Sequence, residues 1–204
     1  MPAAKHAIIV AHPSLASFNV SVARLYKESV EALGATTVFR DLYRLNFDPT
    51  LRNDEIPRAG GFTPGSDVAA ERALIGDATV FAFVYPLWFN TPPAMLLGYI
   101  QRVFGMGFGY ATQHGGGSSK LLLDRSMISF SSSGSPAEWL RTEGSWSALR
   151  RLFDDHVADS CGMTVLDHRH YGRVLSSVPD CRVDAHFRDV RATVERHFGD
   201  RSVA

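Results

Sequence analysis

The sequence has little of several features, and each scarcity excludes a class of protein. Only two cysteines occur in 204 residues, Cys161 and Cys181, and no Cys-x-x-Cys motif is present, which disfavours a disulfide framework and a structural zinc site. The 21 Lys and Arg residues balance 21 Asp and Glu residues, so no global field attracts nucleic acid or an anionic membrane. The first apolar run, residues 7–11, is too short for a signal sequence or a membrane span. We therefore expect a cytoplasmic protein that binds no nucleic acid and enters no membrane.

Several chemical signatures are also missing. The sequence has no G-x-G-x-x-G of ordinary dinucleotide-binding folds and no G-x-x-x-x-G-K-S/T of P-loop nucleotide hydrolases. No G-x-S-x-G elbow marks a nucleophilic serine. The pair His168 and His170 has no evident third ligand, so we expect no metal site. Cys161 ends an apolar helical stretch and is expected in the core.

What is present is an alternation of short apolar runs with amphipathic stretches. Runs that are apolar throughout suit parallel strands buried on both faces, and apolar residues spaced three and four apart suit helices. This pattern predicts strands at residues 7–11, 36–39, 80–85, 126–130 and 164–166. It predicts helices at residues 19–33, 67–75, 93–104 and 146–157, and a last one that Gly199 ends. The alternation indicates an α/β sandwich around a parallel sheet.

Polar residues and irregular stretches complete this prediction. Residues 41–65 and 105–119 are rich in glycine or proline and are expected to form loops. Ser66 is expected to cap the helix that follows it. On the predicted helices, Glu71 and Arg72 are expected to face solvent, and so is the run from Asp154 to His156.

Three loops follow predicted strands, and the carboxyl ends of parallel strands are where such folds bind ligands. The first loop, from His12 to Asn19, is rich in hydroxyl groups and opens a helix, whose N-terminal N–H groups favour phosphate. Ser17 either caps this helix or, with Asn19, adds donors for the phosphate. Both interpretations stay open on the pattern alone.

The other two loops contain residues that suit the binding of a flat ring. Residues 85–93 place Trp88, Phe89 and Asn90 at the end of the strongest strand, where they line a flat ligand or pack against the next helix. Residues 131–136 are small and polar, so they either let a ligand approach the backbone closely or form an ordinary solvated turn. Because all three loops converge on one edge of the sheet, a shared binding site is favoured.

Three segments of the sequence resemble a known family: the turn from His12 to Asn19, residues 85–102 (YPLWFNTPPAMLLGYIQR) and residues 108–110. Together they resemble the DT-diaphorase-type NAD(P)H:quinone oxidoreductases, over most of the chain from the first strand to the Cys161-Gly162 step. The resemblance implies one flavodoxin-like, flavin-binding domain over residues 1–204. Its five-stranded parallel sheet would have the order 2-1-3-4-5, with helices on both faces.

The resemblance also implies a function and a set of site residues. It implies FAD or FMN as cofactor, NAD(P)H as electron donor, a small-molecule electron acceptor and a homodimer. Tyr110 matches an aromatic residue that reaches over the partner subunit's flavin, and with Trp139 it is placed in the substrate pocket. The residues matched to the flavin site are His12, Ser17, Phe18, Asn19, Pro86, Leu87, Trp88, Phe89, Asn90, Ser131, Ser132, Ser133 and Gly134.

Departures from the family pattern concern the chemistry more than the cofactor. Trp139 stands at about the position of the family's Tyr, no His occurs between Gly134 and Asp155, and Leu97 replaces a Lys. No catalytic side chain is therefore assigned. The expected activity passes a hydride from NAD(P)H through flavin to a quinone-like or other small aromatic acceptor by a ping-pong mechanism. The alternative is a non-catalytic accessory or regulatory subunit, for example of a potassium-efflux system.

Overall fold

A computed structural model describes residues 4–57, 62–113, 117–175 and 180–199. Its centre is a five-stranded sheet in which every neighbouring pair runs parallel. The strands are β1 (Lys5–Val10), β2 (Thr36–Asp41), β3 (Val80–Pro86), β6 (Ser126–Ser132) and β7 (Thr164–Tyr171), in the order β2-β1-β3-β6-β7. Counted over the strands of this sheet, that is the predicted order 2-1-3-4-5, which is confirmed.

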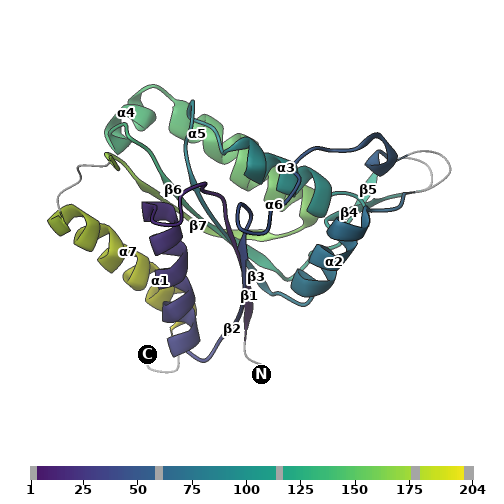
Figure 1. Ribbon diagram of the computed structural model, residues 1–204, viewed down its shortest axis with the longest axis horizontal. Helices are drawn as coiled ribbons and strands as arrows, with labels where there is room; N and C mark the ends of the chain where they lie inside the picture. The colour runs from purple at the N-terminus through teal and green to yellow at the C-terminus, as the bar shows by residue number, and fades with distance from the viewer. Residues whose placement is uncertain (1–3, 58–61, 114–116, 176–179, 200–204) are drawn as a thin grey trace.

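Helices cover both faces of the sheet (Figure 1). On one face lie α1 (Phe18–Ala32) and α7 (Asp180–Phe198); on the other lie α2 (Ser66–Ile75), α3 (Ala94–Val103), α5 (Ser145–Leu149) and α6 (His156–Cys161). Alternate strand residues enter the two cores: Ile9 and Phe83 pack towards α3, whereas Ile8 and Val84 pack towards α1. Burial on both faces explains why these strands are apolar throughout. Within the described ranges, no helix has the length and apolarity needed to cross a membrane.

Some elements were not predicted. Residues 105–119 were expected to be a loop, of which residues 114–116 lie outside the described residues. The described part contains β4 (Tyr110–Thr112) and the start of its antiparallel partner β5 (Ser118–Lys120). The short helix α4 (Ala137–Thr142) follows the glycine-containing loop after β6. Strand β7 runs five residues beyond the predicted end at residue 166, through a polar stretch that has no apolar pattern to reveal it.

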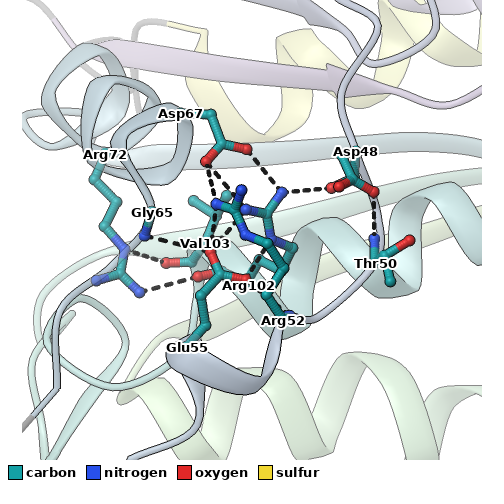
Figure 2. A network of polar contacts seen from close by, with 9 residues as sticks. All are labelled: Asp48, Thr50, Arg52, Glu55, Gly65, Asp67, Arg72, Arg102 and Val103. Carbon is teal, nitrogen blue, oxygen red and sulfur yellow. Dashed lines mark hydrogen bonds and ion pairs between the residues drawn. The ribbon is translucent and has the colours of Figure 1, made fainter.

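Of the expected loop 41–65, residues 58–61 lie outside the described residues, and the rest is held in place by an ion-pair cluster around the buried Arg102 (Figure 2). The loop contains the 3-10 turn η1 (Asn53–Glu55), whose Glu55 carboxylate accepts from Arg102 Nε at 2.8 Å and from Nη2 at 2.7 Å. Asp67 at the start of α2 accepts from Arg102 Nη1 at 2.8 Å. The carbonyl of Asp48 accepts from the same guanidinium. Because Arg102 lies on α3, these contacts fasten the loop and α2 to the helix that follows β3.

Three expectations about α2 were wrong. Glu71 is buried rather than solvated: Arg40 and Tyr99 donate to its carboxylate, the tyrosine hydroxyl at 2.8 Å. Arg72 is half-buried and donates to the last carbonyls of α3, including that of Val103 at 2.9 Å, which offsets the negative end of that helix. Ser66 is the first residue of α2, and Gly65 occupies the cap position. The sequence pattern marks apolar stripes, and buried ion pairs carry no such mark.

Candidate functional site

The three loops expected to converge do enclose a common cavity, of about 650 Å³. It lies where the carboxyl ends of β1, β3 and β6 meet, and its size is within the range of small-molecule sites. Residues from the end of β7 and from α7, including Leu175 and Phe187, complete the wall. The predicted site residues that line the cavity are His12, Ser17, Phe18, Asn19, Pro86, Leu87, Trp88, Ser132, Ser133 and Gly134.

Ser132 joins the three loops. Its carbonyl accepts from the amide of Leu87 at 2.6 Å, which ties the end of β6 to the loop after β3. Its hydroxyl donates to Asn19 Oδ1 at 2.7 Å, which ties the same point to the first turn of α1. Asn19 is buried, so its side chain holds the walls together and is not free to point into the cavity.

The first turn of α1 presents free amides to the cavity. Ser17 has extended backbone angles (φ −75°, ψ 153°), and its hydroxyl accepts from the amide of Val20 at 3.2 Å. The capping interpretation of Ser17 is thereby confirmed. The amides of Phe18 and Asn19 donate to no acceptor within the described residues, as is usual at a helix start. Two N–H groups and the positive end of a 15-residue helix therefore face one end of the cavity.

The loop after β3 ends in a strained turn. Phe89 and Asn90 have positive φ angles of 52° and 59°, and Trp88 and Thr91 exchange backbone hydrogen bonds of 3.1 Å. A bulky residue rarely adopts this conformation, which costs energy that surrounding contacts must offset. The turn leaves Trp88 half-exposed at the cavity, with its ring 6.0 Å from that of His12.

The same turn directs two of the predicted site residues elsewhere. The side chain of Phe89 is fully exposed, and Asn90 Nδ2 donates to Ser145 Oγ at 3.4 Å. Both residues border a separate hollow of about 260 Å³ beside Leu97 and Leu152, and not the main cavity. The structure therefore does not bring them together with the other site residues, because the left-handed turn points them away.

Ser131 lies behind the cavity wall. Its side chain is buried, and its hydroxyl lies 2.7 Å from His168 Nε2 and 2.9 Å from His170 Nδ1. Successive strand residues face opposite sides of a sheet, so Ser131 points away from the side on which Ser132 meets Asn19. The two histidines, on β7, thus contact hydroxyl groups; no cluster suited to a metal ion occurs among the described residues.

Asp154 was expected to face solvent, and it is fully buried. It lies in the π-helical turn η2 (Arg150–Asp155), whose wider winding turns both Phe153 and Asp154 inward. Its carboxylate accepts from Ser129 Oγ at 2.8 Å and lies 2.5 Å from His168 Nδ1. The signal in the sequence was two pairs of alternating residues, Ser129 with Ser131 and His168 with His170. Only the strand register shows that the serines lie opposite the histidines.

The two residues assigned to the substrate pocket lie outside the cavity of this chain. Tyr110 borders another hollow of about 310 Å³, beside Phe104, His156 and Cys161. Trp139 is partly exposed on α4. Cys161 is buried as expected, and burial raises the pKa of its thiol to about 11, which leaves it protonated.

Comparisons with known proteins identify the family to which the chain belongs. A protein family described as having a flavodoxin-like fold matches residues 4–194. An uncharacterised NAD(P)H oxidoreductase of Haemophilus influenzae is 32% identical over 170 residues, covering 83% of this chain and 84% of that protein. NAD(P)H dehydrogenase (quinone) 1 of Rattus norvegicus is 26% identical over 200 residues, covering 86% of this chain and 71% of that protein.

The structural comparison gives the same class. The NAD(P)H:quinone oxidoreductase from Methanothermobacter marburgensis superposes with a TM-score of 0.82 and 26% identity, over 96% of this chain and 98% of that one. Fold, loops and relatives thus define a flavodoxin-like α/β protein. More narrowly, the chain belongs to the flavodoxin-like family of NAD(P)H:quinone oxidoreductases.

Proposed function

We propose that this chain is one flavin-binding domain that passes a hydride from NAD(P)H, through the flavin, to a quinone-like or other small aromatic acceptor. The observation that carries the proposal is the cavity of about 650 Å³, whose wall combines the free amides at the start of α1 with Trp88 and the small-residue loop after β6. The relatives named above, which are NAD(P)H and quinone oxidoreductases, support the same activity.

The start of α1 fits the phosphate of a flavin. The unengaged amides of Phe18 and Asn19 would donate to phosphate oxygens, and the helix dipole favours their charge. The hydroxyl of Ser17 accepts from the amide of Val20, so the amides of Phe18 and Asn19 are the ones left for a ligand. FMN and FAD both carry a phosphate at this position, so the geometry suits either cofactor.

The loop after β6 fits the edge of a flat ring. The amide of Ser133 donates to the carbonyl of Tyr171 at 3.0 Å, whereas that of Gly134 donates to no acceptor in the described part of the chain. A Cβ on Gly134 would lie 3.1 Å from Leu175 Cδ2. Glycine therefore leaves space for close approach and a free N–H for the electron-rich ring edge.

A bound flavin supplies the hydride chemistry, and the protein supplies orientation and charge. Trp88 is half-exposed and would give the nicotinamide and the acceptor an apolar wall on the open side. One open side serves both substrates in turn, which supports a ping-pong order.

We also propose that the protein acts as a homodimer. Three exposed apolar side chains, Phe89, Leu97 and Leu152, gather around the hollow of about 260 Å³. A second copy would cover them and would bring its own Tyr110 towards the site, as the family resemblance implies. Sedimentation equilibrium tests this; a monomer at micromolar concentration would contradict it.

Steady-state kinetics test the activity. Protein reconstituted with FMN or FAD is assayed for NADH and NADPH oxidation with a soluble benzoquinone, each substrate being varied in turn. We expect quinone-dependent turnover and parallel double-reciprocal lines. Flavin binding without turnover would favour the accessory-subunit alternative, and intersecting lines would contradict the ping-pong order.

A further inference from the structure

A continuous chain of hydrogen bonds runs from the buried Asp154 to the wall of the cavity. His168 Nδ1 lies 2.5 Å from Asp154 Oδ2, and His168 Nε2 lies 2.7 Å from Ser131 Oγ. The same hydroxyl lies 2.9 Å from His170 Nδ1, and His170 Nε2 lies 3.0 Å from Ser133 Oγ. Ser133 lines the cavity. Both nitrogens of each ring are thereby engaged, and no link exceeds hydrogen-bond distance.

This chain of hydrogen bonds is shielded from solvent. The side chains of Asp154 and His168 are completely buried, and Ser131 is nearly so. The ring of Trp146 lies over both histidines, 4.7 Å from His168 and 5.7 Å from His170 between centroids. In so dry a setting the hydrogen bonds strengthen one another, and an unmade bond is costly.

With His168 neutral, every donor in the chain points towards Asp154. His168 Nδ1–H donates to the carboxylate, Ser131 Oγ–H donates to His168 Nε2, and His170 Nδ1–H donates to Ser131. Ser133 Oγ–H then donates to His170 Nε2. Every ring nitrogen and hydroxyl has a partner in this arrangement.

With one more proton on His168, every hydrogen bond between His168 and Ser133 reverses, so that its donor points towards the cavity. His168 Nε2–H donates to Ser131, Ser131 Oγ–H donates to His170 Nδ1, and His170 Nε2–H donates to Ser133. The hydroxyl of Ser133 then donates to the carbonyl of Ser135, 2.9 Å away. The two arrangements satisfy the same atoms and differ by one proton.

We propose that Asp154, His168, Ser131, His170 and Ser133 form a reversible proton relay that opens into the cavity. When Ser133 gives its proton to a group in the cavity, it takes one from His170 Nε2, which gains one at Nδ1 from Ser131. Ser131 in turn takes the Nε2 proton of His168. One proton leaves, and His168 ends neutral.

The relay's use rests on the proposed function. Quinone reduction combines NAD(P)H, one proton and the quinone to give NAD(P)⁺ and hydroquinone; two electrons leave the nicotinamide as hydride. The relay would supply that proton and refill from solvent when the product leaves. Asp154 and the histidines act through Ser133 and are positioning residues.

The groups that surround the relay suit this role. Burial, with smaller contributions from His168, Arg141 and His186, lowers the pKa of His170 to about 4. His170 is therefore neutral near pH 7 and able to donate at one nitrogen while accepting at the other. The charged and titratable groups that face the chain are Tyr85 of β3, Arg141 of α4, Arg150 of η2, Asp167 of β7 and His186 of α7.

The test is the tautomer of His170, read from the nitrogen-15 NMR of labelled full-length protein with and without FMN, between about pH 4 and pH 9. We expect His170 to carry its proton on Nδ1 when His168 carries one proton and on Nε2 when His168 carries two, so that the two rings change state together. Ser131→Ala should uncouple the two, and Ser131→Thr should restore the coupling. Ser126→Ala, on the same strand, is the matched control.

Turnover and the pH profile give a second readout. Ser131→Ala should slow quinone reduction at saturating flavin at least about tenfold and change the shape of the pH profile of turnover, whereas Ser126→Ala should do neither. A single His170 tautomer across the whole range, or unchanged turnover in Ser131→Ala, overturns the relay. Failure of the proposed function is distinct, because the unaltered protein would then bind no flavin or show no turnover.

Discussion

Ser132 Oγ lies 2.7 Å from Asn19 Oδ1 and 2.9 Å from its Nδ2, joining the end of β6 to the start of α1 across 113 residues of chain. Asn19 is buried, so this contact replaces water for its amide. The carbonyl of Ser132 holds Leu87 as well. One serine thus fixes the relative positions of the start of α1 and the loops that follow β3 and β6.

Removal of this hydroxyl should affect both stability and binding. Ser132→Ala leaves the Asn19 amide short of a partner, which should cost about 1–3 kcal/mol of unfolding free energy. Looser walls should also weaken FMN binding about tenfold, measured by fluorescence titration. Ser126→Ala, at the opposite end of β6, serves as the control. Equal behaviour of the two variants would contradict a role for Ser132 in holding the loops together.

The amide of Phe18 can be tested by a matched pair of substitutions. Phe18→Pro removes the N–H at the first helical position, where proline is well tolerated and where the extended Ser17 suits a following proline. Phe18→Ala removes the same ring but keeps the N–H. We expect Phe18→Pro to bind FMN about 10- to 100-fold more weakly than Phe18→Ala, the worth of one hydrogen bond to a charged group. Equal dissociation constants would place the phosphate elsewhere.

The cluster in Figure 2 predicts a contrast between two arginines that share acidic partners. Arg102 is fully buried, so Arg102→Gln leaves Glu55 buried without its main cation and should cost about 3–5 kcal/mol. Arg52 also contacts Glu55 and Asp67 but is 43% exposed, and Arg52→Gln should cost at most about 1 kcal/mol. Urea denaturation measures both. Similar losses in the two variants would show that burial does not set the difference.

His6 should make stability depend on pH. Burial lowers its pKa to about 4, while its hydrogen bond to Tyr26 spans 2.8 Å. The unfolded chain, with a histidine pKa near 6.5, binds the proton first, so stability present above about pH 6.5 is lost as the pH falls towards 4. His6→Phe should reduce the slope in this window by up to about 1.4 kcal/mol per pH unit. Urea midpoints between these pH values measure it; an unchanged slope would contradict the assignment.

The parts of the fold that were predicted correctly share one property. Strands such as β3 are buried on both faces, so every residue is apolar and the pattern is visible locally. The loops of the site could be found because the ends of parallel strands meet at one edge. Which residues of a loop face the cavity could not be found, because the turn at Phe89 and Asn90 depends on positive φ angles in residues that rarely adopt them.

The missed features are mostly polar groups that the fold buries. Glu71, Arg72 and Asp154 look like surface residues in the sequence, since their partners lie far along the chain. Asp154 was hidden further by the π-helical turn, which shifts the inward face by one position. The relay histidines lie on a part of β7 whose polar sequence gave no sign of a strand.

Flavin binding in the cavity is tested most directly by the absorption spectrum of purified protein mixed with FMN or with FAD and freed of excess cofactor, before and after anaerobic addition of NADH or NADPH. We expect one flavin to stay bound in equimolar amount with a perturbed spectrum, and we expect its visible absorption to bleach on addition of the nicotinamide. Protein that stays colourless with both flavins would contradict the assignment of the cavity and, with it, the proposed oxidoreductase activity.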